Sequence, residues 1–216
     1  MEYLVASEGH LAIEARLRLT RAAAEALELR GAFHIAVPGG SVATLLFPSF
    51  AEAALDWSRV HVWWVDERVV PQSHPDSNFK AANDLWLSKV PAIAHPFHSV
   101  AEYAAQLPLR LDVALLGVGP DGHVASLFPG HEGLDVTNKR AFAVDDSPKP
   151  PPRRLTLSLP EICASNEVWV MVAGQAKAAM MAQALRPDSQ LPVGRVLREA
   201  EGIARLWLDP AAAAQL

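Results

Sequence analysis

The chain has 216 residues, of which 50% are hydrophobic and 20% charged, a composition that excludes long disordered tails and allows one α/β domain with a substantial core. Its formal net charge of −5 gives no general attraction to nucleic acid, so an anionic ligand would have to be held by a local cluster of basic groups. We therefore expect a single domain spanning residues 1–216 that binds a small anion and no nucleic acid.

Short apolar, β-rich runs alternate along the chain with Ala- and Leu-rich segments of helical period. This alternation predicts an α/β fold, with a mostly parallel sheet covered by helices on both faces. We expect strands and helices to alternate throughout and the last run to close the sheet. In chain order, the predicted elements are a helix at 7–31 capped by Ser7, a strand at 33–37, a helix from about Val42, a strand at 60–65, a helix at 77–87 capped by Ser77, strands at 112–116, 155–159 and 167–173, a helix at 175–185 and a strand at 203–208.

Prolines at positions 148, 150, 151 and 152 make the stiffest stretch of the sequence. Because core strands are predicted on either side, we interpret this stretch as a positioning loop within the domain and not as a linker between domains. No element is assigned around residues 90–100.

Polar and Gly-rich sequences come directly after three of the predicted strands, at residues 38–41, 66–68 and 117–123. The carboxyl ends of parallel strands lie along one edge of a sheet, which is where open α/β folds bind their ligands. The three motifs are therefore predicted to converge on one crevice.

The first two motifs each allow a functional and a structural interpretation. Gly39, Gly40 and Ser41 precede a helix, so their backbone N–H groups and the helix N-terminus could hold a phosphate, although the same residues could form a plain tight turn. Arg68 could pair with a phosphate while Asp66 orders a water or a hydroxyl, although a surface ion pair explains the same residues.

The third motif, GVGPDGH at residues 117–123, matches the dinucleotide-binding pattern G-x-G-x-x-G. We exclude that function because Pro129 and Gly130 follow too soon for the required helix, and because Asp121 would put a negative charge at the phosphate position. The motif instead presents His123 at a strand end with the carboxylate of Asp121 two residues away, which favours a catalytic imidazole over a structural one.

Basic residues further along the chain extend the site. Arg153 and Arg154 follow the prolines, and Lys177 lies on the first turn of a predicted helix behind Gly174, where a ligand could come close. A solvated helix face is the simpler interpretation of Lys177.

Several classes of site and location are excluded by what the chain lacks. Cys163 is the only cysteine, so we expect a reducing compartment and neither a disulfide nor a thiolate zinc site. The other histidines show no metal-ligand spacing, and no serine lies in a G-x-S-x-G elbow. Residues 1–5 do not begin a signal peptide, and no apolar run approaches the roughly 18 residues of a membrane span, so we expect a cytoplasmic protein without membrane contact.

Long motifs of the sequence resemble the 6-phosphogluconolactonase branch of the glucosamine-6-phosphate isomerase/6-phosphogluconolactonase family, almost from end to end. The motifs that carry the resemblance are WVDERVVP at 64–71, DSNF at 76–79, LGVGPDGHVASLFPG at 116–130, SPKPP at 147–151, RLTL at 154–157 and GQAKA at 174–178. The resemblance implies a Rossmann-like sheet and the hydrolysis of 6-phospho-D-glucono-1,5-lactone in the oxidative pentose phosphate pathway, with no cofactor and no metal. We expect a monomer or a weak homo-oligomer.

The resemblance also implies roles for individual residues. His123 is the expected general base, with Asp66 and Asp121 nearby. The expected phosphate ligands are Gly39, Gly40, Ser41, Arg68, Arg154 and Lys177. The chain departs from the family pattern at Val42 and Ala43, where Thr-Pro is usual, so a hydroxyl expected near the phosphate is missing.

Two alternative functions remain. An amino-sugar phosphate isomerase/deaminase of the same family would place a Glu where this chain has Phe128. A non-catalytic sugar-phosphate sensor would need a DNA-binding segment, for which the sequence leaves no room before the first predicted strand.

Overall fold

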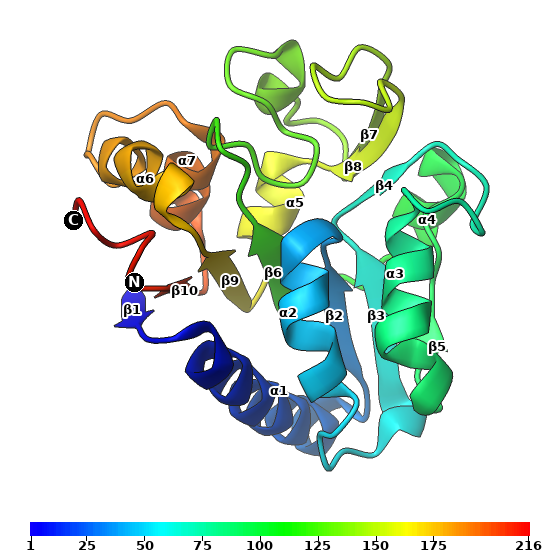
Figure 1. Cartoon of the computed structure of the whole chain (residues 1–216). Helices are drawn as coiled ribbons and strands as arrows, with labels where there is room; N and C mark the ends of the chain where they lie inside the picture. The colour runs from blue at the N-terminus through cyan, green and yellow to red at the C-terminus, as the bar shows by residue number, and fades with distance from the viewer.

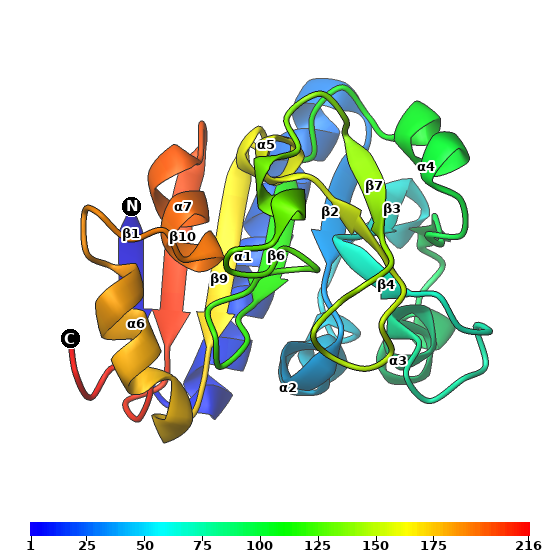
Figure 2. The same cartoon turned by 90° about the horizontal axis from the view of Figure 1, so that it is seen from above.

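Seven strands form the main sheet of this computed structural model, which describes residues 1–216. All neighbouring strands of the main sheet run parallel, and Figure 2 shows most of them side by side with their arrowheads toward one edge. The mostly parallel sheet is therefore confirmed. From one edge to the other, the strands are β1 (Glu2–Val5), β10 (Ile203–Leu208), β9 (Glu167–Val172), β6 (Val113–Gly117), β2 (Phe33–Val37), β3 (Val60–Trp64) and β5 (Ile93–Ala94).

Helices cover both faces of the main sheet, as predicted. In Figure 2, α5 and α7 lie over the near face while α1 passes behind the sheet. The helices are α1 (Glu8–Arg30), α2 (Gly40–Phe50), α3 (Asn78–Leu85), α4 (Val100–Gln106), α5 (Leu159–Cys163), α6 (Ala178–Ala184) and α7 (Pro192–Glu199). Short 3-10 turns add η1 (Trp57–Arg59), η2 (Leu87–Lys89), η3 (Glu132–Asp135) and η4 (Gln175–Lys177). None of the helices is long and apolar enough to cross a membrane.

The longest helix, α1, shows how local sequence sets the element boundaries. Ser7 caps its start by accepting a hydrogen bond from the backbone N–H of His10, and Gly31 ends it in the left-handed conformation with φ of 79°. Leu11, Ala15 and Leu19 recur at the helical period and are fully buried, so they form its packed face.

The structure contains a second, smaller sheet, so the prediction that strands and helices alternate throughout one sheet is wrong. Its antiparallel strands are β4 (Asp66–Arg68), β8 (Arg154–Leu157) and β7 (Ala141–Val144), and Figure 1 shows them above the ends of β2 and β3. The run predicted at 155–159 therefore belongs to this sheet and not to the parallel one. A short apolar run does not reveal its partner strand, so the sequence could not separate the two sheets. Buried side chains of both sheets join one hydrophobic cluster of 60 residues, as expected for a single domain.

Four further features differ from the prediction. The sheet closes at β1, and β10 lies inside it between β1 and β9. β1 has only four residues, too few for an alternating pattern to reveal a strand. The helix predicted at 77–87 ends at Leu85, and the helix predicted from Val42 begins at Gly40. The helix predicted at 175–185 is divided into η4 and α6, so Lys177 lies at their junction.

Candidate active site

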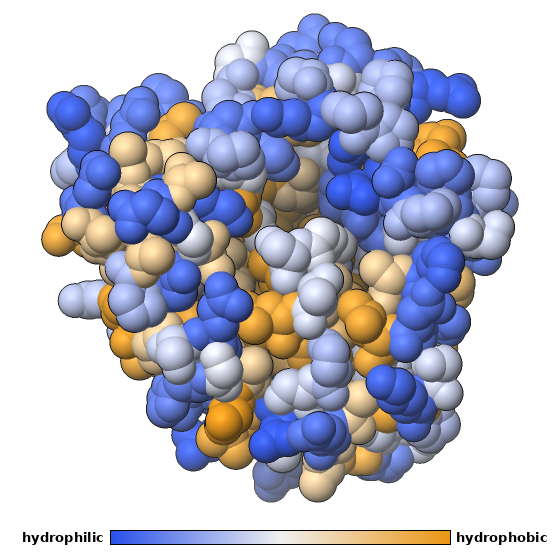
Figure 3. Space-filling view, viewed as in Figure 1, coloured by the Kyte–Doolittle hydropathy of each residue, from blue (hydrophilic) through white to orange (hydrophobic).

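The three predicted motifs meet in one cavity at the carboxyl edge of the main sheet. They follow β2, β3 and β6, and Figure 3 shows the surface hollowed above α2, with hydrophilic side chains along one rim. The cavity has a volume of about 140 Å³. The predicted site residues that line it are Gly39, Gly40, Ser41, Asp66, Arg68, His123 and Arg154.

The start of α2 presents an uncapped helix N-terminus to this cavity. Gly39 is the N-cap residue and supplies no side-chain hydrogen bond, and the first turn contains no acidic residue. Gly40 has φ of 65°, and a side chain there would meet no other atom within 4 Å, so the space beside it is open. The free N–H groups and the helix dipole therefore favour an anion at this position.

Two arginines face each other beside the helix start. Arg68 on β4 and Arg154 on β8 are directly opposite in the antiparallel ladder, and both line the cavity. Arg154 is only 5% exposed, and burial, with the charge of Arg68 adding to it, lowers its pKa. Its guanidinium is held by the carbonyls of residues 149–151, with Asp66 Oδ2 3.9 Å away. Like charges placed opposite each other are unfavourable unless a counter-ion joins them, so this pair is suited to an anion.

Asp66 lies at the floor of the cavity with its carboxylate held on both sides. Its Oδ2 accepts a hydrogen bond from Ser126 Oγ at 2.7 Å, and its Oδ1 accepts one from Asn78 Nδ2 at 3.1 Å. Asp66 is 5% exposed, so its direction is set by these donors and by the nearby Arg154. A carboxylate fixed in this way can orient a hydroxyl or a water in the cavity.

The loop after β6 presents His123 to the cavity with one ring nitrogen already engaged. Nδ1 lies 2.5 Å from Asp121 Oδ1, and the ring packs against Phe128 with 4.8 Å between the ring centroids. A Cβ at Gly119 would lie 2.1 Å from the His123 ring, so only glycine lets the imidazole occupy this place. Nε2 forms no hydrogen bond within the protein and remains the nitrogen able to meet a ligand.

Asp121 does not line the cavity and acts on it through His123. Burial pushes the pKa of Asp121 upward, but the hydrogen bonds and charge of His123 outweigh burial and hold it below the ordinary value. Asp121 Oδ2 also lies 3.4 Å from Nζ of Lys149, which is within the proline-rich loop. The Asp121 carboxylate is therefore ionised near neutral pH. It links His123, in the 117–123 motif, to Lys149 in the proline-rich loop.

Lys177 is the one predicted phosphate ligand that does not line the cavity. It is the last residue of η4, directly before α6, and follows β9, the strand next to β6 in the sheet. Burial lowers its pKa, with Asp209 opposing the change. Of the adjacent arginines 153 and 154, only Arg154 lines the cavity, and Arg153 is exposed.

Several residues that shape the site were given no role by the sequence. Glu67 is 7% exposed and accepts hydrogen bonds from the backbone N–H groups of Asn78 and Phe79, so it anchors the start of α3. Burial raises its pKa, and these backbone hydrogen bonds act in the opposite direction. Asn78, Ser126 and Lys149 lie inside sequence motifs that resemble the family, but nothing in the local sequence indicates which side chains they contact.

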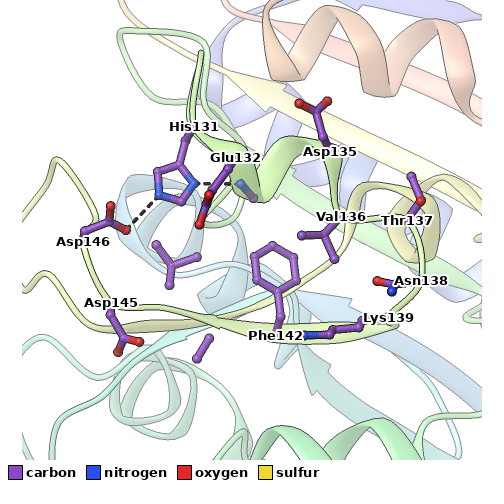
Figure 4. A pocket seen from close by; sticks show the side chains of 13 residues that line it. His131, Glu132, Asp135, Val136, Thr137, Asn138, Lys139, Phe142, Asp145 and Asp146 are labelled. Atoms are coloured by element: carbon purple, nitrogen blue, oxygen red, sulfur yellow. Dashed lines mark hydrogen bonds and ion pairs between the residues drawn. The ribbon is translucent and has the colours of Figure 1, made fainter.

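A larger cavity, of about 870 Å³, lies between η3 and β7 and lacks the features of the site. Both ring nitrogens of its only histidine, His131, are engaged, by Asp146 and by the backbone N–H of Gly133 (Figure 4). Its lining includes the carboxylates of Glu132, Asp135, Asp145 and Asp146, which would repel a phosphate. The smaller cavity is therefore the candidate active site.

Comparison with known proteins assigns the chain to one sequence family. Residues 6–207 match the model described as glucosamine-6-phosphate isomerases/6-phosphogluconolactonase. A 6-phosphogluconolactonase of Streptomyces coelicolor is 37% identical over 95% of this chain and 90% of its own length. A probable chloroplastic 6-phosphogluconolactonase of Oryza sativa subsp. indica is 37% identical over 97% of this chain and 74% of its own length.

The solved structures agree with this assignment. The 6-phosphogluconolactonase of Trypanosoma brucei superimposes with a TM-score of 0.88 at 25% sequence identity, over 100% of this chain and 98% of the other. The two chains therefore share the same overall fold.

Proposed function

The chain belongs to the glucosamine-6-phosphate isomerase/6-phosphogluconolactonase family, and we propose that it hydrolyses 6-phospho-D-glucono-1,5-lactone to 6-phospho-D-gluconate in the oxidative pentose phosphate pathway. The observation that carries this proposal is the meeting of two kinds of group in one cavity. His123 presents an imidazole whose Nε2 is free to accept a proton, and Arg68 and Arg154 form a paired cationic site. A phosphorylated ester needs both.

The phosphate is bound by the arginines and by the start of α2. Gly39, Gly40 and Ser41 contribute backbone N–H groups, and the guanidinium groups contribute charge and hydrogen bonds. Lys177 approaches the phosphate from the neighbouring strand end. Binding energy at this remote group holds the lactone carbonyl in register with the catalytic imidazole.

In the reaction, His123 acts first as base and then as acid. Nε2 takes a proton from water as the water oxygen attacks the lactone carbonyl, forming a new C–O bond and a tetrahedral oxyanion. When the ring C–O bond breaks, the imidazolium returns the proton to the departing ring oxygen. Asp121 stabilises the charged imidazolium, and Asp66 orients a substrate hydroxyl or the attacking water.

The environment of His123 also separates this reaction from that of the amino-sugar phosphate branch. An enzyme of that branch would place a Glu at position 128. This chain instead packs the apolar ring of Phe128 against His123. With no second carboxylate beside it, the imidazole is suited to accept a proton from water, which favours the lactonase.

We further propose that the enzyme works in the cytoplasm as a monomer or a weak homo-oligomer, without a metal or an organic cofactor. Cys163 is buried, and burial raises the pKa of its thiol to about 12, so it is an inert core residue compatible with a reducing compartment.

A coupled assay tests the proposed function. The lactone is generated in place by oxidising glucose 6-phosphate, and acid release is followed after subtraction of the uncatalysed hydrolysis. Catalysed opening that saturates with lactone is expected, whereas a rate equal to the uncatalysed one would overturn the proposal. Parallel incubation with glucosamine 6-phosphate, with ammonia release as the readout, tests the alternative.

A further inference from the structure

Asn78 lies between two parts of the candidate active site without facing its cavity. It is the first residue of α3, and only 1% of it is exposed. Glu67 Oε1 accepts a hydrogen bond from its backbone N–H at 2.8 Å, which fixes the position of the main chain. The side chain is therefore held in a set direction inside the protein.

The amide group of Asn78 contacts Asp66 through two hydrogen bonds. Nδ2 donates to the backbone oxygen of Asp66 at 2.8 Å and to its Oδ1 at 3.1 Å. A backbone carbonyl oxygen can only accept a hydrogen bond, so the NH₂ side of the amide must face Asp66. The amide oxygen consequently points the other way.

That amide oxygen lies against Gly39 at the start of the anion-binding loop. A Cβ placed on Gly39 would be 1.8 Å from Asn78 Oδ1, far inside contact distance. Gly39 has φ of −101°, which any residue adopts, so the contact with Asn78 and not the backbone conformation is what disfavours a side chain here. Asn78 thus fills the gap between Gly39 and Asp66.

We infer that Asn78 is a positioning residue that holds the Asp66 carboxylate and the Gly39 loop at a fixed separation. The inference rests on the proposed function, because a lactone bound by its phosphate at the loop must present its ester to His123 and Asp66. The remaining donors to Asp66, Ser126 Oγ and the Arg154 guanidinium, both approach Oδ2, so only Asn78 fixes Oδ1. Removing the amide frees the carboxylate to turn and the loop to move toward it.

A kinetic double-mutant cycle tests the action of Asn78 through Asp66. Asn78→Ala is expected to lower kcat by about 10- to 100-fold with KM changed by less than about threefold, as a small misplacement of a reacting group does. In the Asp66→Ala background, the same change is expected to lower kcat by less than about threefold, because its target is gone. Asn83→Ala, on the same helix, is the control and is expected to leave kcat unchanged. Equal effects of Asn78→Ala in both backgrounds would overturn the inference.

A second cycle measures stability and is independent of activity. Gly39→Ala is expected to lower the melting temperature of the parent by several degrees because the new methyl group overlaps Asn78. In the Asn78→Ala background, the same substitution is expected to cost less than half as much. Strictly additive shifts in melting temperature would show that Asn78 does not separate the Gly39 loop from Asp66.

If Asn78→Ala does not fold, as judged by circular dichroism, Asn78→Ser replaces it in both cycles. A parent without lactonase activity would refute the proposed function, and the melting cycle would still decide the role of Asn78.

Discussion

Asp121 Oδ1 lies 2.5 Å from Nδ1 of His123, so the carboxylate determines which ring nitrogen carries the proton. An ionised carboxylate only accepts hydrogen bonds, and the pKa of Asp121 is held below its ordinary value by His123. Nδ1 is therefore the protonated nitrogen of the neutral ring, and Nε2 keeps the lone pair that a general base needs.

Replacing the imidazole tests this assignment. His123→Asn keeps a similar size and some hydrogen bonding but removes the basic nitrogen. We expect kcat to fall about 10²- to 10⁴-fold, the range for one general acid–base group, with KM changed little. Initial rates must be corrected for uncatalysed lactone hydrolysis. A folded variant that turns over at nearly the parental rate would transfer the role of base to Asp66.

Replacing Asp121 tests the carboxylate separately from the ring. Asp121→Asn preserves the shape but removes the charge, and its amide can donate to Nδ1 and so select the other tautomer. We expect kcat to fall about 10- to 10³-fold with KM nearly unchanged. Lys149→Ala, which leaves the bond between Asp121 and His123 intact, is the matched control and should have a smaller effect. An unchanged kcat in Asp121→Asn would mean that Asp121 does not control the tautomer.

The position of the site could be predicted from the sequence, but its internal contacts could not. Strand order along the chain and the shared edge of parallel strands suffice to bring Gly39, Asp66 and His123 together. Asp66, in contrast, depends on Asn78 and Ser126, which are 12 and 60 residues away, and no local pattern encodes such pairs. The antiparallel sheet was missed for the same reason, because strand pairing is a tertiary property.

The paired arginines predict where substrate affinity is lost. Arg68→Ala is expected to raise KM about 10- to 100-fold with a smaller effect on kcat, since a hydrogen bond to a charged group contributes about 1.5–3 kcal/mol. Lys177→Ala should act in the same direction but less strongly, because Lys177 does not line the cavity. Exposed Arg153, changed to Ala, is the control for the loss of one positive charge. Parental kcat/KM in Arg68→Ala would move the phosphate site elsewhere.

Turnover is expected to survive exhaustive treatment with EDTA. The structure contains no group of three or more His, Cys, Asp or Glu side chains arranged to hold a metal ion, and the proposed mechanism needs only His123 and its partners. The measurement is kcat before and after chelation, with added Mg²⁺, Mn²⁺ or Zn²⁺ in separate reactions. Activity that disappears on chelation and returns with one of these metals would contradict the prediction.

Stability is expected to fall in acid because of three stacked histidines on the main sheet, His34, His61 and His95. Burial, with the charge of His61 adding to it, lowers the pKa of His34 to about 4, and burial also lowers the pKa of the other two. An unfolded histidine titrates near 6.5, so the unfolded state binds more protons as pH falls, and stability is lost from about pH 6.5 down through pH 4. His34 alone accounts for about 1–3 kcal/mol of this loss.

The test is His34→Gln, which keeps an acceptor for Trp63 Nε1. This variant should flatten the dependence of the melting temperature on pH between 7 and about 4.5. The control, His10→Gln at an exposed position, should not change that dependence. Parallel curves for the parent and His34→Gln would show that the stack does not govern acid stability.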